Sequence, residues 1–127
     1  MMKTESGKMF LRENRKLQLS DLIKIIPEND WNWYLYEVDA VGCALYGLSM
    51  PDFEALVLSK EYGLEMTWSE AKLFADSLED IKTFFMVASA ELLAYEDIDD
   101  LTNCLAIINI VDSSDWQVKI NGGGIPR

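Results

Sequence analysis

The feature that most restricts how this chain folds is a pair of strand-like segments near its C-terminus. Residues 104–111 (CLAIINIV) and 116–120 (WQVKI) are dominated by branched and aromatic side chains, which favour the extended conformation. The connector DSSD supplies Asp and Ser side chains that can bond backbone amides in a tight turn. The two segments therefore predict an antiparallel β-hairpin, and the rest of the chain must provide a sheet and a cover for it.

Two segments upstream have the spacing of apolar residues that is typical of amphipathic helices. In the first, residues 19–26, Ser20 is the expected N-cap, and Pro27 ends the helix because the residue before a proline disfavours the helical conformation. The second, residues 67–80, opens with a Thr-x-x-Glu capping box. Its apolar side chains recur along one face of the helix: Ala71, Phe74, Ala75 and Leu78.

The segment WNWYLYEV (residues 31–38) predicts a strand, because aromatic and branched residues are frequent in strands. Simple alternation divides its side chains between two faces, with Trp31, Trp33 and Leu35 on one and Asn32, Tyr34, Tyr36 and Val38 on the other. We expect the first face to fill the core. Tyr34 and Tyr36 would then be available as anchors for a partner protein.

Two further segments fit both a helix and a strand. Residues 53–58 alternate well enough for a strand, although Ser49 and Asp52 resemble a helix capping box. Residues 83–89 have helical spacing but the composition of a core strand, which we favour. Together, these elements predict an α+β fold in which an antiparallel or mixed sheet packs against two to three helices and ends in the β-hairpin.

The length of the chain fits a single domain over residues 1–127. We expect a mobile segment over residues 1–16 and a flexible tail over residues 121–127, whose NGGGIPR sequence is either native or a remnant of cloning. No secretory signal is visible and no apolar run reaches the length of a membrane span, so we expect a cytoplasmic protein. In that compartment Cys43 and Cys104 are expected to be two buried thiols.

Charge is distributed unevenly along the sequence. The chain carries 22 acidic and 11 basic residues and no histidine, which gives a net charge of −11. Residues 1–24 hold six of the basic residues against three acidic ones, and no basic residue lies between Lys82 and Lys119. Such a surface repels nucleic acids and anionic membranes, so we expect neither as a direct partner. It attracts basic proteins; the alternative is that the acidity serves solubility alone.

Metal binding and catalysis find little support in the sequence. An EF-hand loop starting at Asp97 would match at Asp99 but fail at Leu101, Thr102 and Ile108, where an oxygen ligand, a glycine and a bidentate glutamate are needed. Without histidine the chain has no Ser–His or Cys–His nucleophilic pair, and it contains no Walker, G-x-G-x-x-G or G-x-S-x-G motif. We expect no metal, no cofactor and no catalytic residue.

The stretch YEDIDDLTN (residues 95–103) gathers four carboxylates within five residues. Capping the start of a short helix would use one or two of them. A complementary basic surface on another protein would use all four, together with the acids that follow in the sequence. The predicted partner-binding residues are therefore Glu96, Asp97, Asp99, Asp100, Asp112 and Asp115, with Tyr34 and Tyr36 as aromatic anchors.

The segments TWSEAKLFADSLEDI, TFFMVAS and IINIVDSSDWQV, within residues 64–120, resemble immunity proteins of bacterial toxin systems, including contact-dependent inhibition and other polymorphic toxins. The resemblance is one of general pattern and includes no motif, so it assigns no role to any residue. It implies a small cytoplasmic α+β protein that neutralises a cognate toxin domain, often a basic nuclease, by covering or displacing its active site.

We therefore predict a non-enzymatic immunity protein that binds a cognate, basic toxin through an acidic surface. Two alternatives stay open. One is an acidic nucleic-acid mimic or another inhibitor protein. The other is a small ligand-binding protein or enzyme of unknown class, which would need a deep pocket with convergent polar groups. The sequence gives no indication of the oligomeric state.

Overall fold

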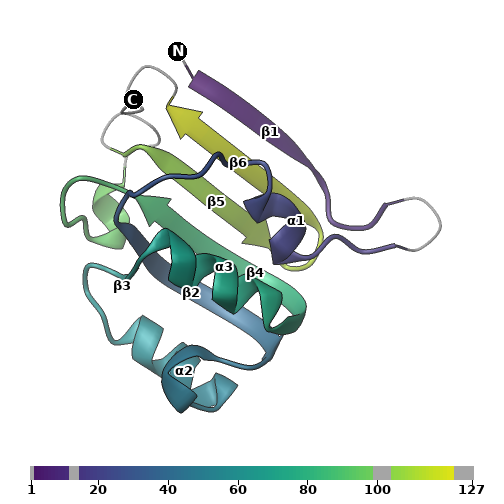
Figure 1. Cartoon of the computed structure of the whole chain (residues 1–127), viewed down its shortest axis with the longest axis horizontal. Coiled ribbons are helices and arrows are strands. Elements are labelled where there is room, and N and C mark those ends of the chain that lie inside the picture. Colours follow the sequence, from purple (N-terminus) through teal and green to yellow (C-terminus); the bar gives the residue numbers. More distant parts are fainter. Residues whose placement is uncertain (1, 12–14, 99–103, 122–127) are drawn as a thin grey trace.

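A computed structural model of the protein describes residues 2–11, 15–98 and 104–121, and it has the α+β fold that the sequence predicts. Six strands form one open antiparallel sheet in the order β1-β6-β5-β4-β2-β3 (Figure 1). In chain order the elements are β1 (Met2–Lys8), α1 (Leu19–Ile23), β2 (Trp33–Gly42), η2 (Leu45–Gly47), α2 (Met50–Leu58), β3 (Leu64–Met66), α3 (Trp68–Asp76), β4 (Leu78–Ala88), η3 (Tyr95–Asp97), β5 (Ala106–Val111) and β6 (Asp115–Asn121).

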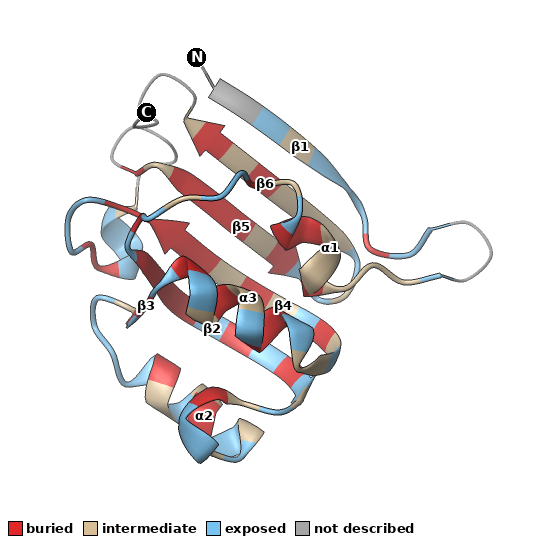
Figure 2. Cartoon of the chain, viewed as in Figure 1, coloured by how far each residue is buried: buried red, intermediate tan, exposed pale blue. Residues whose placement is uncertain are grey.

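The main hydrophobic core lies between one face of the sheet and the helices (Figures 1 and 2). Helices α1 and α3 cross this face, and α2 lies beside β2. Trp68 of α3 stacks on Trp33 of β2 with ring centroids 5.0 Å apart, and Phe53 of α2 packs on Phe74 of α3 at 5.1 Å. All four are buried, and burying a large apolar side chain stabilises a fold by roughly 1.5–3 kcal/mol.

The two predicted helices are present, and their first turns show why they start where they do. Thr67 and Glu70 form the predicted capping box of α3: each side chain accepts a hydrogen bond from the backbone N–H of the other, at 3.1 and 2.9 Å. In α1 the N-cap is Gln18 rather than Ser20, and the Asp21 carboxylate accepts the Gln18 N–H at 2.9 Å. Helix α1 therefore begins after Gln18 because the carboxylate of Asp21, in its first turn, caps the backbone there.

The two ambiguous segments are assigned by the structure. Residues 53–58 belong to α2, whose N-cap Ser49 accepts a hydrogen bond from the N–H of Asp52 at 3.2 Å. Residues 83–88 belong to β4, so the favoured strand is confirmed. This strand begins at Leu78, which the sequence had placed on the preceding helix. The predicted C-terminal hairpin is also confirmed, as the antiparallel pair β5 and β6.

A β-bulge in β2 changes which side chains face the core. The register between β2 and β4 shifts between Leu35 and Glu37, and the alternation of side chains reverses there. Tyr36 and Glu37 both lie away from the main core, whereas Val38 joins that core with Leu35. The prediction that Val38 shares a face with Tyr34 and Tyr36 is therefore wrong, because strict alternation assumes a strand without an inserted residue.

The opposite face of the sheet carries a second, smaller apolar cluster. Tyr34 and Tyr36 belong to it and are only 5% and 7% exposed, packed with Val87 and Ile107. Tyr95 and Ile98 of the connection between β4 and β5 pack against this cluster, and the Tyr36 hydroxyl donates a hydrogen bond to the Leu93 carbonyl at 2.6 Å. The expectation that both tyrosines are exposed to a partner is wrong, because residues 93–98 and the turn that contains Gly63 lie against the face that they share.

The two edges of the sheet are built differently. Strand β1 forms one edge and pairs with β6 over residues 2–8, part of the segment expected to be mobile. At the other edge, β3 covers only the first three residues of β2. Helix α2 runs beside the remainder, where the Glu54 carboxylate accepts the N–H of Ala40 at 3.2 Å. A helix with a side-chain acceptor thus protects this edge from pairing with another strand.

Two further findings bear on the sequence predictions. No helix within residues 2–11, 15–98 and 104–121 is long and apolar enough to cross a membrane. Cys104 is buried as expected, but Cys43 is exposed just after the end of β2, which corrects the expectation of two buried thiols.

Candidate functional site

The structure places four of the six predicted acidic residues, and it separates these four into two groups. Glu96 and Asp97 lie in η3, within the connection that leads into β5. Asp112 and Asp115 lie at the turn between β5 and β6, at the other end of β5 (Figure 1). Asp99 and Asp100 lie outside the described residues. The predicted acids that the structure describes therefore occupy two places on the molecule.

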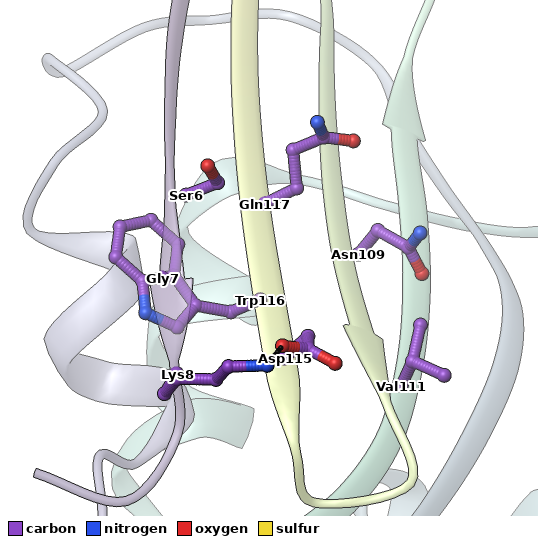
Figure 3. A pocket seen from close by; sticks show the side chains of 8 residues that line it. All are labelled: Ser6, Gly7, Lys8, Asn109, Val111, Asp115, Trp116 and Gln117. Carbon is purple, nitrogen blue, oxygen red and sulfur yellow. Dashed lines mark hydrogen bonds and ion pairs between the residues drawn. The ribbon is translucent and has the colours of Figure 1, made fainter.

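Asp115 has a partner within the sheet. Its Oδ1 accepts a hydrogen bond from Lys8 Nζ at 2.6 Å, and this bond lowers the pKa of the Asp115 carboxyl below its usual value. The pair lies beside a hollow of about 360 Å³ on the sheet, which Ser6, Asn109 and Gln117 also line. Figure 3 shows how these side chains lie. Polar side chains are usual on the solvated face of an antiparallel sheet, so this hollow needs no ligand to explain it.

A larger hollow, of about 460 Å³, lies between the C-terminal end of α2, the bulged part of β2, and η3. We call it the acidic groove. Its lining residues come from three separate parts of the chain: Tyr36 and Glu37 from β2, Val57, Leu58, Lys60 and Glu61 from α2 and the turn after it, and Tyr95 and Glu96 from η3.

Local structure in β2 and α2 explains two sides of the acidic groove. The bulge puts Glu37 on the same side of the sheet as Tyr36, so a buried aromatic ring and an exposed carboxylate become neighbours there. In α2, Phe53 and Val57 are four residues apart and turn into the core. Leu58 follows Val57 by one residue, about 100° around the helix, and is therefore 73% exposed.

The turn after α2 closes against the tyrosines of β2. The N–H of Gly63 donates to the carbonyl of Lys60 at 3.2 Å, and Gly63 has a φ of +81°, in the left-handed region that favours glycine. A Cβ on this residue would lie 3.1 Å from ring atoms of Tyr36. Glycine thus allows the close approach that brings Glu61 to the acidic groove.

Aromatic contacts hold η3 in place on the third side of the groove. The Tyr95 ring meets Phe85 edge to face, with centroids 5.4 Å apart and planes at 74°, and lies 6.2 Å from the Tyr36 ring. Burial raises the pKa of Tyr36 to about 12, with smaller contributions from Tyr34 and Cys104. The Tyr36 hydroxyl therefore stays protonated at neutral pH, as its hydrogen bond to the β4–β5 connection requires.

The charges around the acidic groove are mainly negative. Among the described residues that line it, exposed carboxylates come from Glu37, Glu61 and Glu96, against one basic side chain, Lys60. Hydrogen bonding to Glu61 raises the pKa of the neighbouring Tyr62 above its ordinary value, and the charges of Glu61 and Asp97 raise it further. Asp97 therefore adds to the negative potential at this rim.

Exposed apolar side chains lie among these charges. Leu58 and Tyr95, which is 59% exposed, both line the acidic groove, and the half-exposed Tyr62 follows Glu61 directly. Contiguous apolar patches with a polar rim are typical of surfaces that bind other proteins. The arrangement is suited to a protein segment that carries both a cation and apolar area.

Sequence reasoning found part of this site. Glu96 lines the acidic groove and Tyr36 lies in it, while Asp97 acts on its rim; Glu37 and Glu61 were missed. Both missed acids lie outside the acidic run of residues 95–103. The bulge in β2 brings Glu37 to the groove, and the turn after α2 brings Glu61 to it. The sequence did contain one indication of the site. If residues 50–58 form a helix, the side chain of Leu58 lies outside the apolar face that contains Phe53 and Val57.

Among the residues that the structure describes, no group of three or more Cys, Asp or Glu side chains is placed to hold a metal ion. In comparisons with known proteins, no family model matches the chain, and neither a curated protein nor a solved structure shows a significant match.

Proposed function

We propose that the protein is an immunity-type inhibitor that binds a basic toxin domain through the acidic groove. The observation that carries this proposal is the lining of the groove, where carboxylates from three parts of the chain surround the exposed side chains of Leu58 and Tyr95. Carboxylates attract and orient the basic side chains of a partner. Burial of the apolar groups then supplies the area that holds the complex together.

In this mechanism the protein acts stoichiometrically and performs no reaction. Lys and Arg residues that would grip the substrate phosphates of a toxin pair with Glu37, Glu61 and Glu96 instead. Ion pairs with hydrogen bonds are strongest where water is excluded, next to Tyr36 and Val57 at the buried side of the groove. Electrostatic steering can raise the association rate constant towards about 10⁸–10⁹ M⁻¹s⁻¹ at low salt.

Asp112 and Asp115 are not part of this proposed binding surface. Asp115 already pairs with Lys8, and both acids lie at the end of β5 remote from η3. A nucleic-acid mimic would need its carboxylates along one continuous face, spaced like phosphates. Those predicted acids that the structure describes lie in two places, which favours an inhibitor that uses the groove over such a mimic.

The partner to examine is the product of the gene adjacent to this one, co-expressed with the protein in a growth assay. Glu37→Lys combined with Glu61→Lys should abolish the rescue of growth and slow association about tenfold or more at low salt. Lys60→Gln, which removes the basic side chain of the groove, should speed association.

A matched control carries the same change of charge at exposed positions outside the groove lining, Asp76→Lys combined with Glu79→Lys. It should leave rescue and association nearly unchanged. Similar losses in the two double variants would show that net charge alone matters. A wild-type protein that neither binds nor neutralises this partner would contradict the proposed function.

A further inference from the structure

The acidic groove has features that distinguish between the two basic side chains of proteins. We infer that it selects arginine over lysine, so that the partner inserts an arginine side chain between Tyr95 and the surrounding carboxylates. This inference rests on the proposed function, because it names the chemical group that the groove would receive.

The first feature is a fixed aromatic ring with an exposed surface. The Tyr95 ring contacts Phe85 at 5.4 Å and Tyr36 at 6.2 Å between ring centroids, yet Tyr95 is 59% exposed. A planar guanidinium group stacks on such a ring and also gains from the attraction between a cation and the π electrons. The ammonium of lysine has no plane to stack.

The second feature is the origin of the carboxylates. Glu37 extends from β2, Glu61 from the turn after α2, and Glu96 from η3, so they approach the groove from different parts of the fold. A guanidinium has five N–H donors in a rigid fork and can bond more than one carboxylate in a defined geometry. An ammonium is a compact point charge that would gain Coulomb energy but little geometric selection.

The third feature is the apolar wall. Val57 and Leu58 line the groove beside the carboxylates, so an entering cation must lose part of its hydration. Guanidinium is more weakly hydrated than ammonium and loses less on entering such a site. Lys60 already places an ammonium-bearing side chain in the lining, which adds repulsion for any cation but does not discriminate between the two.

The selectivity can be measured with short peptides and the intact protein. The probes are three capped tripeptides, Gly-Arg-Gly, Gly-Lys-Gly and Gly-citrulline-Gly, titrated into ¹⁵N-labelled protein at constant ionic strength. We expect amide shifts centred on residues 36–37, 57–63 and 95–97, with the arginine peptide binding about threefold to tenfold tighter than the lysine peptide. The citrulline peptide keeps the planar shape without the charge and should bind weakest.

Variants separate the ring from the charge. Tyr95→Phe should keep the preference for arginine, whereas Tyr95→Leu, which retains apolar bulk, should reduce it to about twofold or less. Glu37→Gln should weaken both cationic peptides, and Glu79→Gln, at an exposed position outside the groove lining, should weaken neither. Unfolding of Tyr95→Leu would be visible in its spectrum, and the comparison of the three peptides on wild-type protein does not depend on that variant.

Equal affinity for the arginine and lysine peptides, or shifts that lie outside the groove, would overturn the inference. If both peptides bind equally and Glu37→Gln weakens both, the arginine selection is wrong while a cation-binding groove, and with it the proposed function, stands. If arginine is preferred but the adjacent gene product is not neutralised, the inference stands and the proposed function fails.

Discussion

Replacing Gly63 with alanine tests whether the acidic groove depends on the close approach of the turn after α2 to β2. With a φ of +81°, Gly63 holds a conformation that costs other L-residues about 1–2 kcal/mol. An added Cβ would also lie 3.0 Å from the Cβ of Tyr34 and 3.1 Å from two ring atoms of Tyr36. The Tyr34 Cβ cannot move without its strand, so this overpacking should add about 1–3 kcal/mol.

Gly47 provides a matched control for the backbone contribution. Its φ of +69° is also in the left-handed region, but a Cβ added there would meet no atom within 4 Å. Alanine restricts the unfolded chain, which offsets about 0.4–1 kcal/mol of the strain in both variants. We therefore expect a loss of about 1 kcal/mol for Gly47→Ala and about 2–3 kcal/mol for Gly63→Ala.

Urea denaturation followed by tryptophan fluorescence measures both losses as free energies of unfolding, with the slope m checked for constancy. Gly63→Ala should also weaken binding of the arginine tripeptide, because the turn that carries Lys60 and Glu61 must move, whereas Gly47→Ala should not. Equal losses of stability in the two variants would refute the reasoning. They would show that the turn can withdraw from Tyr34 and Tyr36 without cost.

Two further predictions concern hydrogen bonds made by the side chains of Lys16 and Tyr36. Lys16, whose side chain is 13% exposed, donates to Asp80 Oδ1 at 2.6 Å and to two other oxygens, so Lys16→Met should lower the free energy of unfolding by about 2 kcal/mol. Lys82→Met, which removes an exposed pair at 4.0 Å, should cost under about 0.5 kcal/mol; a similar loss in both variants would contradict this assignment. Burial raises the pKa of Tyr36 to about 12, above the value near 10 in unfolded chains. The free energy of unfolding should therefore keep its full contribution from Tyr36 below about pH 10 and lose it as the pH rises towards 12. Tyr36→Phe cannot ionise there and should lose stability at neutral pH, through its missing bond to Leu93, but depend less on alkaline pH in urea titrations; an unchanged alkaline slope would count against it.

The parts of the fold that could be predicted are those whose signal is local. The capping box of Thr67 and Glu70 and the turn-forming DSSD connector act within a few residues, and both gave the right element. Strand β1 was missed because its sequence, MKTESGK, is polar and contains a glycine. It is a strand because β6 offers it a partner along seven residue pairs, and that partner lies more than a hundred residues away.

The candidate site was found only in part, for the same reason. Glu96 and Asp97 stand in a visible acidic run, and the sequence singled them out. Glu37 reaches the groove because a bulge reverses the alternation of β2, and Glu61 because Gly63 lets a turn close on two tyrosines. Neither position can be predicted from the spacing of residues within one segment, because each depends on the packing of segments that are distant in sequence.

The sequence by itself determined the class of fold, the helices α1 and α3, the C-terminal hairpin and the sign of the net charge. Capping, turn chemistry, periodicity and net charge are properties of neighbouring residues or of composition. The tertiary structure alone decided that Tyr34 and Tyr36 are covered, that Asp115 is paired with Lys8, and that the four predicted acids within the described residues lie in two places. The physical reason is that burial and electrostatic potential depend on distances in space, and only the folded chain sets those distances.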